Sequence, residues 1–138
     1  MSQTRSRSLS VALLYSAVVL LSGCGDSANV IGPKNQLEVT AATDQFQLQL
    51  TALDQVTDSR SYDWQNTGAK ATIDVSQEIT GGSATVIIRD ADGTVVYQSD
   101  VADDGDGITA EGTPGTWEIK IVLKNTTGTF NFRLQKVT

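Results

Sequence analysis

A period-two alternation of apolar and polar residues runs through most of the chain, and it constrains the fold more than any other feature. Phe46, Leu48 and Leu50 alternate with glutamine and threonine, and the same pattern recurs at 71–75, 117–124 and 130–135. Alternation of this kind places one face of a strand on a core and the other face in water. No segment from residue 37 onward shows a helical stripe; the best helical candidate, 48–56, is rich in Thr and Gln and favours a strand. The sequence therefore predicts an all-β fold.

Turn-forming residues separate these segments at short intervals. Gly93 ends an Asp90-Ala91-Asp92-Gly93 turn, and Gly128 ends an Asn125-Thr126-Thr127-Gly128 sequence between the last two apolar segments. Glycine supplies the positive φ that a tight hairpin needs. Gly81-Gly82, Gly105, Gly107, Gly112 and Pro114-Gly115 mark further turns. We expect one antiparallel β-sandwich over 37–138, jelly-roll-like, with about seven to nine strands.

Three segments carry a resemblance to a known family. They are 84–93 (ATVIIRDADG), 114–121 (PGTWEIKI) and 128–134 (GTFNFRL). Their order resembles the bacterial pre-peptidase C-terminal domain, in which a strand ending in Asp-x-x-Gly is followed by two Gly-led aromatic strands. The resemblance implies a β-sandwich. It implies little about function, because sandwiches host many functions.

The N-terminus has the composition of a secretory signal peptide. Arg5 and Arg7 precede an apolar run from Leu9 to Leu21, and small residues follow it. A positive segment, an apolar segment and small residues at the cleavage point define such a peptide. The apolar run has 13 residues, which is shorter than the roughly 17–25 that a transmembrane helix needs. We therefore expect residues 1–23 to be removed.

The segment Leu21-Ser22-Gly23-Cys24 resembles the lipobox of bacterial lipoproteins. That resemblance implies cleavage before Cys24 and acylation of Cys24, and two or three acyl chains suffice for stable membrane anchoring. Gly25, rather than an aspartate, follows the cysteine, which favours the outer membrane, with the domain facing the periplasm or the cell surface. Residues 24–36 are rich in Gly, Ser, Asn and Pro, and we expect them to form a flexible tether.

Composition limits the chemistry of the domain. Removal of Arg5 and Arg7 leaves 8 basic against 16 acidic residues in the mature chain, and such an acidic surface repels nucleic acid. The sequence contains no histidine and a single cysteine, so the commonest general base and transition-metal ligand is missing. Neither Ser-x-x-Lys nor Gly-x-Ser-x-Gly occurs. We expect no catalytic residues and no enzyme activity.

The acidic stretch 90–106 raises the possibility of calcium, which binds six to eight oxygen ligands. Asp104-Gly105-Asp106-Gly107 resembles part of an EF-hand loop, but Ala102 and Thr113 stand where that loop needs ligands. A different calcium site formed by Asp103, Asp104 and Asp106 is one hypothesis. The other is that these aspartates, with Asp90 and Asp92, accept hydrogen bonds from nearby backbone amides in turns.

The aromatic residues also allow two interpretations. Tyr62 and Trp64, together with Tyr97 and Trp117, form a stacking platform for sugar rings in one interpretation. In the other they pack in the core, which is the commoner outcome for aromatics at strand spacing.

These observations predict a lipid-anchored, non-catalytic β-sandwich of the cell envelope that serves as a binding or structural module. The partners expected are the membrane, through acylated Cys24, and an envelope protein or polysaccharide, with no cofactor other than calcium. The alternatives are a polysaccharide-binding accessory or enzyme of the envelope and a calcium-stabilised adhesion domain.

Overall fold

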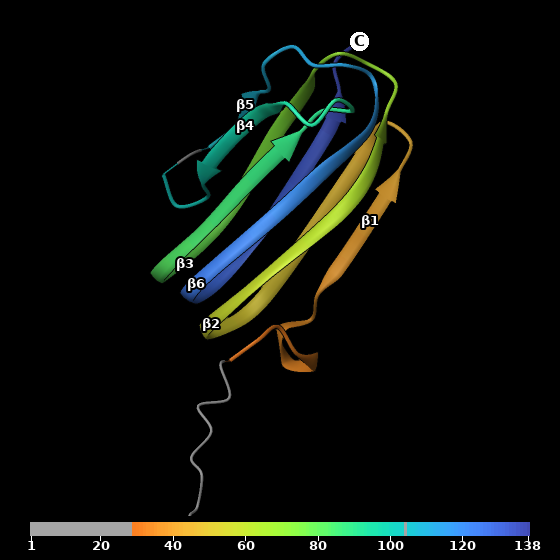
Figure 1. Cartoon of the computed structure of the whole chain (residues 1–138). Coiled ribbons are helices and arrows are strands. Elements are labelled where there is room, and N and C mark those ends of the chain that lie inside the picture. The colour runs from red at the N-terminus through yellow and green to blue at the C-terminus, as the bar shows by residue number, and fades with distance from the viewer. Residues whose placement is uncertain (1–28, 104) are drawn as a thin grey trace, which may run out of the picture.

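Six strands and one short 3-10 helix make up the part of the chain that the computed structural model describes, residues 29–103 and 105–138. All strand pairs are antiparallel, and the strands form one sheet in the order β1-β2-β6-β3-β4, with β5 paired to β3. The elements are η1 (Pro33–Asn35), β1 (Glu38–Ala42), β2 (Gln45–Asn66), β3 (Ala71–Arg89), β4 (Val95–Asp100), β5 (Gly107–Ile108) and β6 (Gly115–Lys136) (Figure 1).

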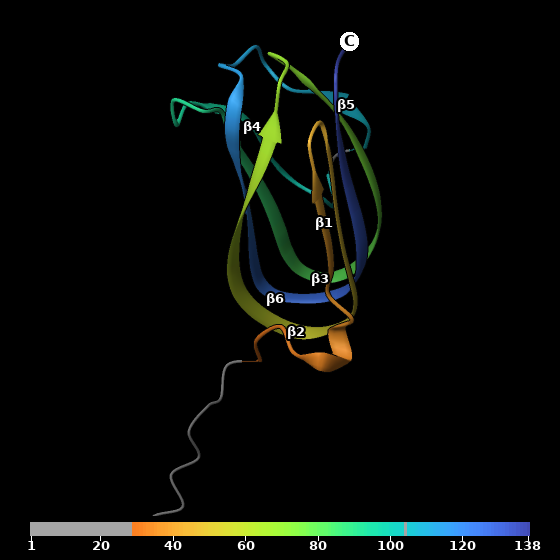
Figure 2. The ribbon, with the colours of Figure 1, turned by 90° about the vertical axis from the view of Figure 1, so that its right-hand side faces the viewer.

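The three long strands, β2, β3 and β6, turn the single sheet into a sandwich. The strand β6 stays paired with β2 on one side and with β3 on the other along nearly its whole length, and the register shifts at 50–58 in β2 and at 79–83 in β3. Such bulges bend a strand and increase its twist. Each long strand therefore crosses the end of the molecule and returns in the opposite layer, so that the strands form a U in side view (Figure 2).

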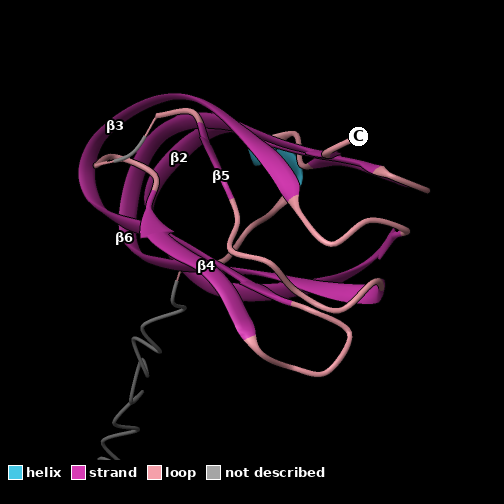
Figure 3. Ribbon diagram, turned by 90° about the horizontal axis from the view of Figure 1, so that it is seen from above, coloured by secondary structure: helices cyan, strands magenta, loops and turns pink. Residues whose placement is uncertain are grey.

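One layer contains β1, the first halves of β2 and β3, β5 and the second half of β6. We call it the β1 layer. The other layer contains the remaining halves and β4, and we call it the β4 layer; the view from above shows the two layers with the core space between them (Figure 3). Both layers contribute alternate residues to one core, as the sequence alternation predicts. The largest side chains of that core are Trp64, Trp117, Phe46, Phe130 and Phe132.

The all-β antiparallel sandwich is confirmed, but the predicted turns at Gly81-Gly82 and Asn125–Gly128 are wrong. Both segments lie inside continuous strands, β3 and β6, at the level where those strands bend. A turn would exchange the neighbours of the strand, whereas β6 lies between β2 and β3 on both sides of residues 125–128. Predicted strand pairs thus join into single strands, which leaves fewer strands among the described residues than predicted. The Asp90–Gly93 turn between β3 and β4 is confirmed, with Gly93 at φ +83°.

The predicted boundary between tether and domain also differs from the structure. Residues 29–36 are docked across the bent end of the sandwich, where Ile31 is buried and Asn35 is fully buried. The Asn35 side chain donates to the carbonyl of Ala52 over 2.9 Å and accepts from the Gly32 amide over 2.9 Å. This part of the predicted tether, 24–36, therefore belongs to the domain, and residues 24–28 lie outside the described residues. No helix within the described residues is long and apolar enough to cross a membrane.

Candidate functional site

A groove of about 450 Å³ lies on the outer face of the β1 layer. It is within the size range of ligand sites, roughly 300–1,000 Å³. Its walls come from four strands, and most of its lining side chains are polar: Thr40, Gln45, Gln47, Thr72, Asp74, Arg133 and Gln135, with Phe46 and Leu134 at the floor.

Strand alternation explains why these side chains meet. Phe46 and Leu134 point into the core, so their neighbours in sequence point outward. The registers then align Thr40 with Gln47, Gln47 with Arg133, and Arg133 with Asp74, which gives one row across β1, β2, β6 and β3. Side chains in such a row lie about 4.5–5.5 Å apart at Cβ.

Arg133 and Asp74 stand opposite each other in this row, yet neither side chain forms a hydrogen bond or ion pair with another described residue. A second Arg–acid pair on the same two strands differs. Arg89 and Glu118 are also register partners of β3 and β6, on the outer face of the β4 layer, and their Nε and Oε1 atoms are 3.9 Å apart. The guanidinium and the carboxylate in the groove thus remain available to a ligand.

A second, shallower hollow continues the groove along the same strands toward the bent end. It measures about 340 Å³. Gln49 and Asn131 lie at its wall, and Asn131 Nδ2 donates to Gln49 Oε1 over 3.2 Å. The other lining residues are Ser76, Gln77, Glu78 and Thr129. Together the two hollows form an extended polar surface, which we call the groove face.

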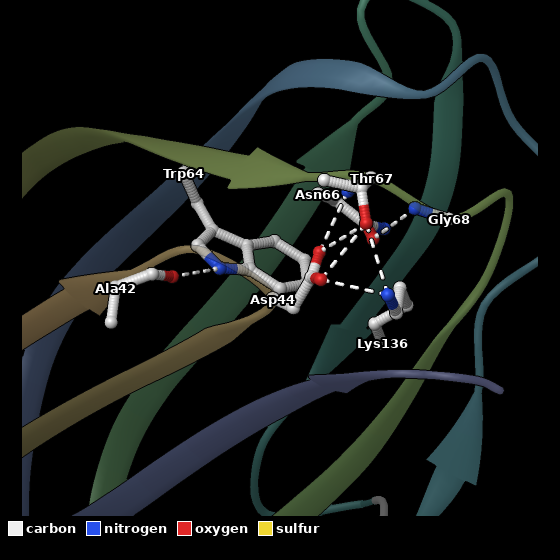
Figure 4. A network of polar contacts seen from close by, with 7 residues as sticks. All are labelled: Ala42, Asp44, Trp64, Asn66, Thr67, Gly68 and Lys136. Carbon is white, nitrogen blue, oxygen red and sulfur yellow. Dashed lines mark hydrogen bonds and ion pairs between the residues drawn. The ribbon is translucent and has the colours of Figure 1, made fainter.

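A clasp of three chain segments holds the strand ends beside the groove (Figure 4). Asp44, in the β1–β2 turn, accepts from the Thr67 amide over 2.7 Å and from Lys136 Nζ over 2.8 Å. The hydrogen bond from Lys136, followed by that from the Thr67 amide, lowers the pKa of the Asp44 carboxyl. Since Asp44 adjoins Gln45 and Lys136 adjoins Gln135, the clasp fixes two strands that line the groove.

Two of the aromatic residues predicted as a sugar platform lie in the core. Trp64 and Trp117 are 1% and 0% exposed, and their rings meet edge to face at 5.8 Å. Trp64 Nε1 donates to the Ala42 carbonyl over 3.0 Å (Figure 4), and Trp117 Nε1 donates to the Thr113 carbonyl over 2.8 Å. The stacking hypothesis is therefore wrong for both indoles, because neither ring face reaches solvent.

Tyr62 is half-buried and packs with its ring centroid 6.1 Å from that of Phe46. Its hydroxyl is buried and has no hydrogen-bond partner among the described residues. Burial, more than the nearby charges, raises the pKa of this hydroxyl. Tyr97 is half-buried against the same core. Neither tyrosine lines the groove.

The acidic stretch is used in part for turns. Asp90 Oδ1 accepts from the amides of Asp92 and Thr94, and its Oδ2 accepts from the Thr113 amide over 2.9 Å. These backbone bonds, that from Thr113 foremost, lower the pKa of the Asp90 carboxyl. Asp92 Oδ2 accepts from the Thr113 hydroxyl over 2.7 Å, which ties the turn to the loop before β6.

Two of the three predicted calcium ligands, Asp103 and Asp106, lie within the described residues. Asp103 is exposed, and Asp106 Oδ1 accepts from the Val75 amide over 3.4 Å. Asp104 lies outside the described residues, as does Cys24. No group of three acidic, cysteine or histidine residues in the described part is arranged to hold a metal ion. Calcium at Asp103, Asp104 and Asp106 stays a prediction.

Sequence reasoning missed the groove. The available signal was the set Gln45, Gln47 and Gln49, three identical amide side chains at alternate positions of one strand. The position of Arg133 beside Asp74 depends on the pairing of β3 with β6, which the sequence does not specify.

No family model matches the chain, and no curated protein matches it significantly. Nine chains of solved structures match it, among them the three that follow. "Accessory secretory protein 1,2 and 3 in Streptococcus pneumoniae" is 10% identical, with a TM-score of 0.37 over 74% of this chain and 86% of that one. The "Glycosylation Associate Protein (Gap123) complex from Streptococcus agalactiae" is 11% identical, with a TM-score of 0.40 over 82% and 43%. "CBM4 structure and function" is 18% identical, with a TM-score of 0.38 over 74% and 76%.

Proposed function

We propose that this chain is a lipid-anchored, non-catalytic binding module of the bacterial cell envelope, and that the groove face is its ligand site. The observation that carries the proposal is the groove itself, where polar side chains from four strands converge and Arg133 and Asp74 have no partner among the described residues. Outward side chains without partners can exchange their water for a ligand at little cost.

Attachment to the membrane rests on the lipobox at Leu21–Cys24. The docked segment 29–36 lies at the bent end of the sandwich, and the C-terminus lies at the opposite end (Figures 1 and 2). An anchor at Cys24 therefore holds the bent end toward the membrane. The long strands then point away from the bilayer, and the groove face is presented sideways.

The side chains that line the groove face support binding rather than catalysis. The lining of the groove face includes two carboxylates, Asp74 and Glu78. They stand four residues apart on one strand, about 13 Å at 3.3 Å per residue, whereas most glycoside hydrolases place two carboxyl groups about 5–9.5 Å apart around the bond they cleave. The sequence contains no histidine to act as a general base.

Photo-crosslinking in intact bacteria tests the proposed site. A photoreactive amino acid replaces Gln47 in the groove or, as a matched control, Lys120 on the outer face of the β4 layer. We expect adducts of raised mass from position 47 and none from position 120. Equal labelling from both positions, or none from position 47, contradicts the assignment of the groove face.

Metabolic labelling with a fatty-acid analogue tests the anchor separately. We expect the wild-type chain to incorporate the label and to enter the detergent phase, and we expect Cys24→Ser to abolish both. Label retained by Cys24→Ser would exclude the lipobox as the attachment point.

A further inference from the structure

The outward positions of the groove face match the hydrogen-bonding character of sugar hydroxyls. A hydroxyl both donates and accepts, and a glutamine side chain also does both. Gln45, Gln47 and Gln49 stand in line along β2, and Gln135 and Asn131 stand beside them on β6. Such a surface can satisfy many hydroxyls at once, whatever their orientation.

The Arg133–Asp74 pair gives this surface one group that only donates hydrogen bonds beside one group that only accepts them. A guanidinium only donates, and an ionised carboxylate only accepts. Neighbouring hydroxyls on one sugar ring satisfy both groups when one hydroxyl accepts from Arg133 and the other donates to Asp74. Hydrogen bonds to charged groups are stronger than those between neutral groups. The pair is therefore suited to a vicinal diol.

The charge of the surroundings disfavours an anionic ligand. Glu38, Asp74 and Glu78 stand on this face against Arg133, and the chain as a whole carries a net charge of −6. A polyanion meets like-charge repulsion at such a surface. An apolar peptide gains little here, because Phe46 and Leu134 at the groove floor are 2% exposed.

The length of the groove face indicates a polymer. The hollows follow one another from the row of Gln45 and Gln135 to the row of Thr129 and Glu78. At about 3.3 Å per strand residue, the β6 segment from 129 to 135 spans roughly 20 Å.

We infer that the groove face binds a neutral polysaccharide and that Arg133 and Asp74 together recognise its vicinal hydroxyls. This inference rests on the proposed function, since it names the ligand class of that site.

Affinity electrophoresis of the mature chain carrying Cys24→Ser tests the inference. The gels contain dextran, mannan or starch as neutral probes, and polygalacturonate or alginate as anionic probes. We expect retardation by at least one neutral polymer and a loss of retardation after that polymer is treated with periodate and reduced, which removes its vicinal diols. We expect Arg133→Ala and Asp74→Ala each to weaken binding at least tenfold.

Arg89→Ala and Glu118→Ala provide the matched control, because they remove the same groups from the same two strands on the opposite layer. We expect both to bind like wild type. Circular dichroism melting of each variant separates loss of binding from loss of folding.

Three further outcomes overturn the inference without overturning the proposed function. If anionic polymers bind, and if this binding is lost in Arg133→Ala but kept in Asp74→Ala, the groove recognises negative charge instead. Binding that survives periodate treatment would exclude the diol. Retardation by none of the polymers, with protein adducts from position 47 in the crosslinking experiment, would assign the groove to a protein partner. Failure of both experiments overturns both proposals.

Discussion

Asp90 shows how a single carboxylate can organise two loops. Its two oxygens accept from three backbone amides, those of Asp92, Thr94 and Thr113. The side chain therefore fixes both the β3–β4 turn and the approach to β6. The sequence allows two roles for the acidic residues at turns, accepting hydrogen bonds from backbone amides or binding calcium. Asp90 accepts hydrogen bonds from backbone amides.

The pH dependence of stability follows from the lowered pKa of Asp90. A carboxyl whose folded pKa is lowered stabilises the fold above its unfolded pKa, near 3.9, and this contribution is lost as the pH falls through the folded pKa. We expect Asp90→Asn to lower the urea midpoint at pH 7, and the difference from wild type to shrink below about pH 4. Asp54→Asn, at an exposed position of β2 where the side chain forms no hydrogen bond with a described residue, should leave the midpoint at pH 7 unchanged. A constant difference from pH 7 to pH 2 would contradict this account.

Substitutions of Trp64 and Tyr62 should have different effects on the free energy of unfolding, although the two residues are neighbours on the inner face of β2. Trp64→Phe removes a satisfied donor and volume from the core, and we expect a loss of about 2–4 kcal/mol in the free energy of unfolding. Tyr62→Phe removes a buried hydroxyl that has no partner among the described residues, so we expect no loss or a gain of about 1 kcal/mol. Urea unfolding measures both, and a loss above about 2 kcal/mol for Tyr62→Phe would show that its hydroxyl is satisfied.

At the scale of elements, the bends of the long strands decide the architecture. Gly128 has φ +135°, and a Cβ built there would lie 2.1 Å from the carbonyl oxygen of Glu78 on the neighbouring strand. Only glycine permits this approach, because the clash is with backbone that is itself held in the sheet.

Replacement of Gly128 should therefore destabilise the fold much more than replacement of a glycine with free space around its Cα atom. We expect Gly128→Ala to lower the free energy of unfolding by more than about 3 kcal/mol. Gly107→Ala is the matched control, since nothing lies within 4 Å of the Cβ that it adds. Thermal unfolding followed by circular dichroism compares them, and equal melting temperatures would contradict the role assigned to Gly128.

The elements were largely predictable and their connections were not. Alternation at 46–51 and 117–124 predicts strands and their buried faces, and those residues are buried as predicted. Glycine at 82 and 128 signals a change of direction, but a hairpin turn and a bend within a strand both use positive φ. A hairpin turn and a bend differ in which strands pair on either side of the glycine. That pairing is set by contacts between residues far apart in sequence.

At the scale of the whole molecule, the docked N-terminal segment extends the domain beyond the predicted boundary. A mature chain that lacks residues 29–36 loses the burial of Ile31 and the hydrogen bonds of Asn35. We expect this deletion to lower the free energy of unfolding by about 3 kcal/mol. Asn35→Ala alone should account for a substantial part of it. If the deletion leaves the urea midpoint unchanged, residues 29–36 belong to the tether and not to the folded domain.

The candidate site was less predictable than the fold, for a physical reason. Asp74 and Arg133 are far apart in sequence, and only the register of β3 on β6 places them side by side. The aromatic hypothesis failed for Trp64 because its position satisfies the alternation equally well facing inward, where its ring meets Trp117.

The strand β6, which follows β2 and β3 in the chain, lies between them in the sheet. Neither of those strands can complete its pairing until β6 is present, because their mutual contacts run through it. Formation of the sandwich therefore waits for β6, and non-local pairing of this kind is slow. During synthesis or export, the emerging chain stays open until β6 has been released, and closes only then.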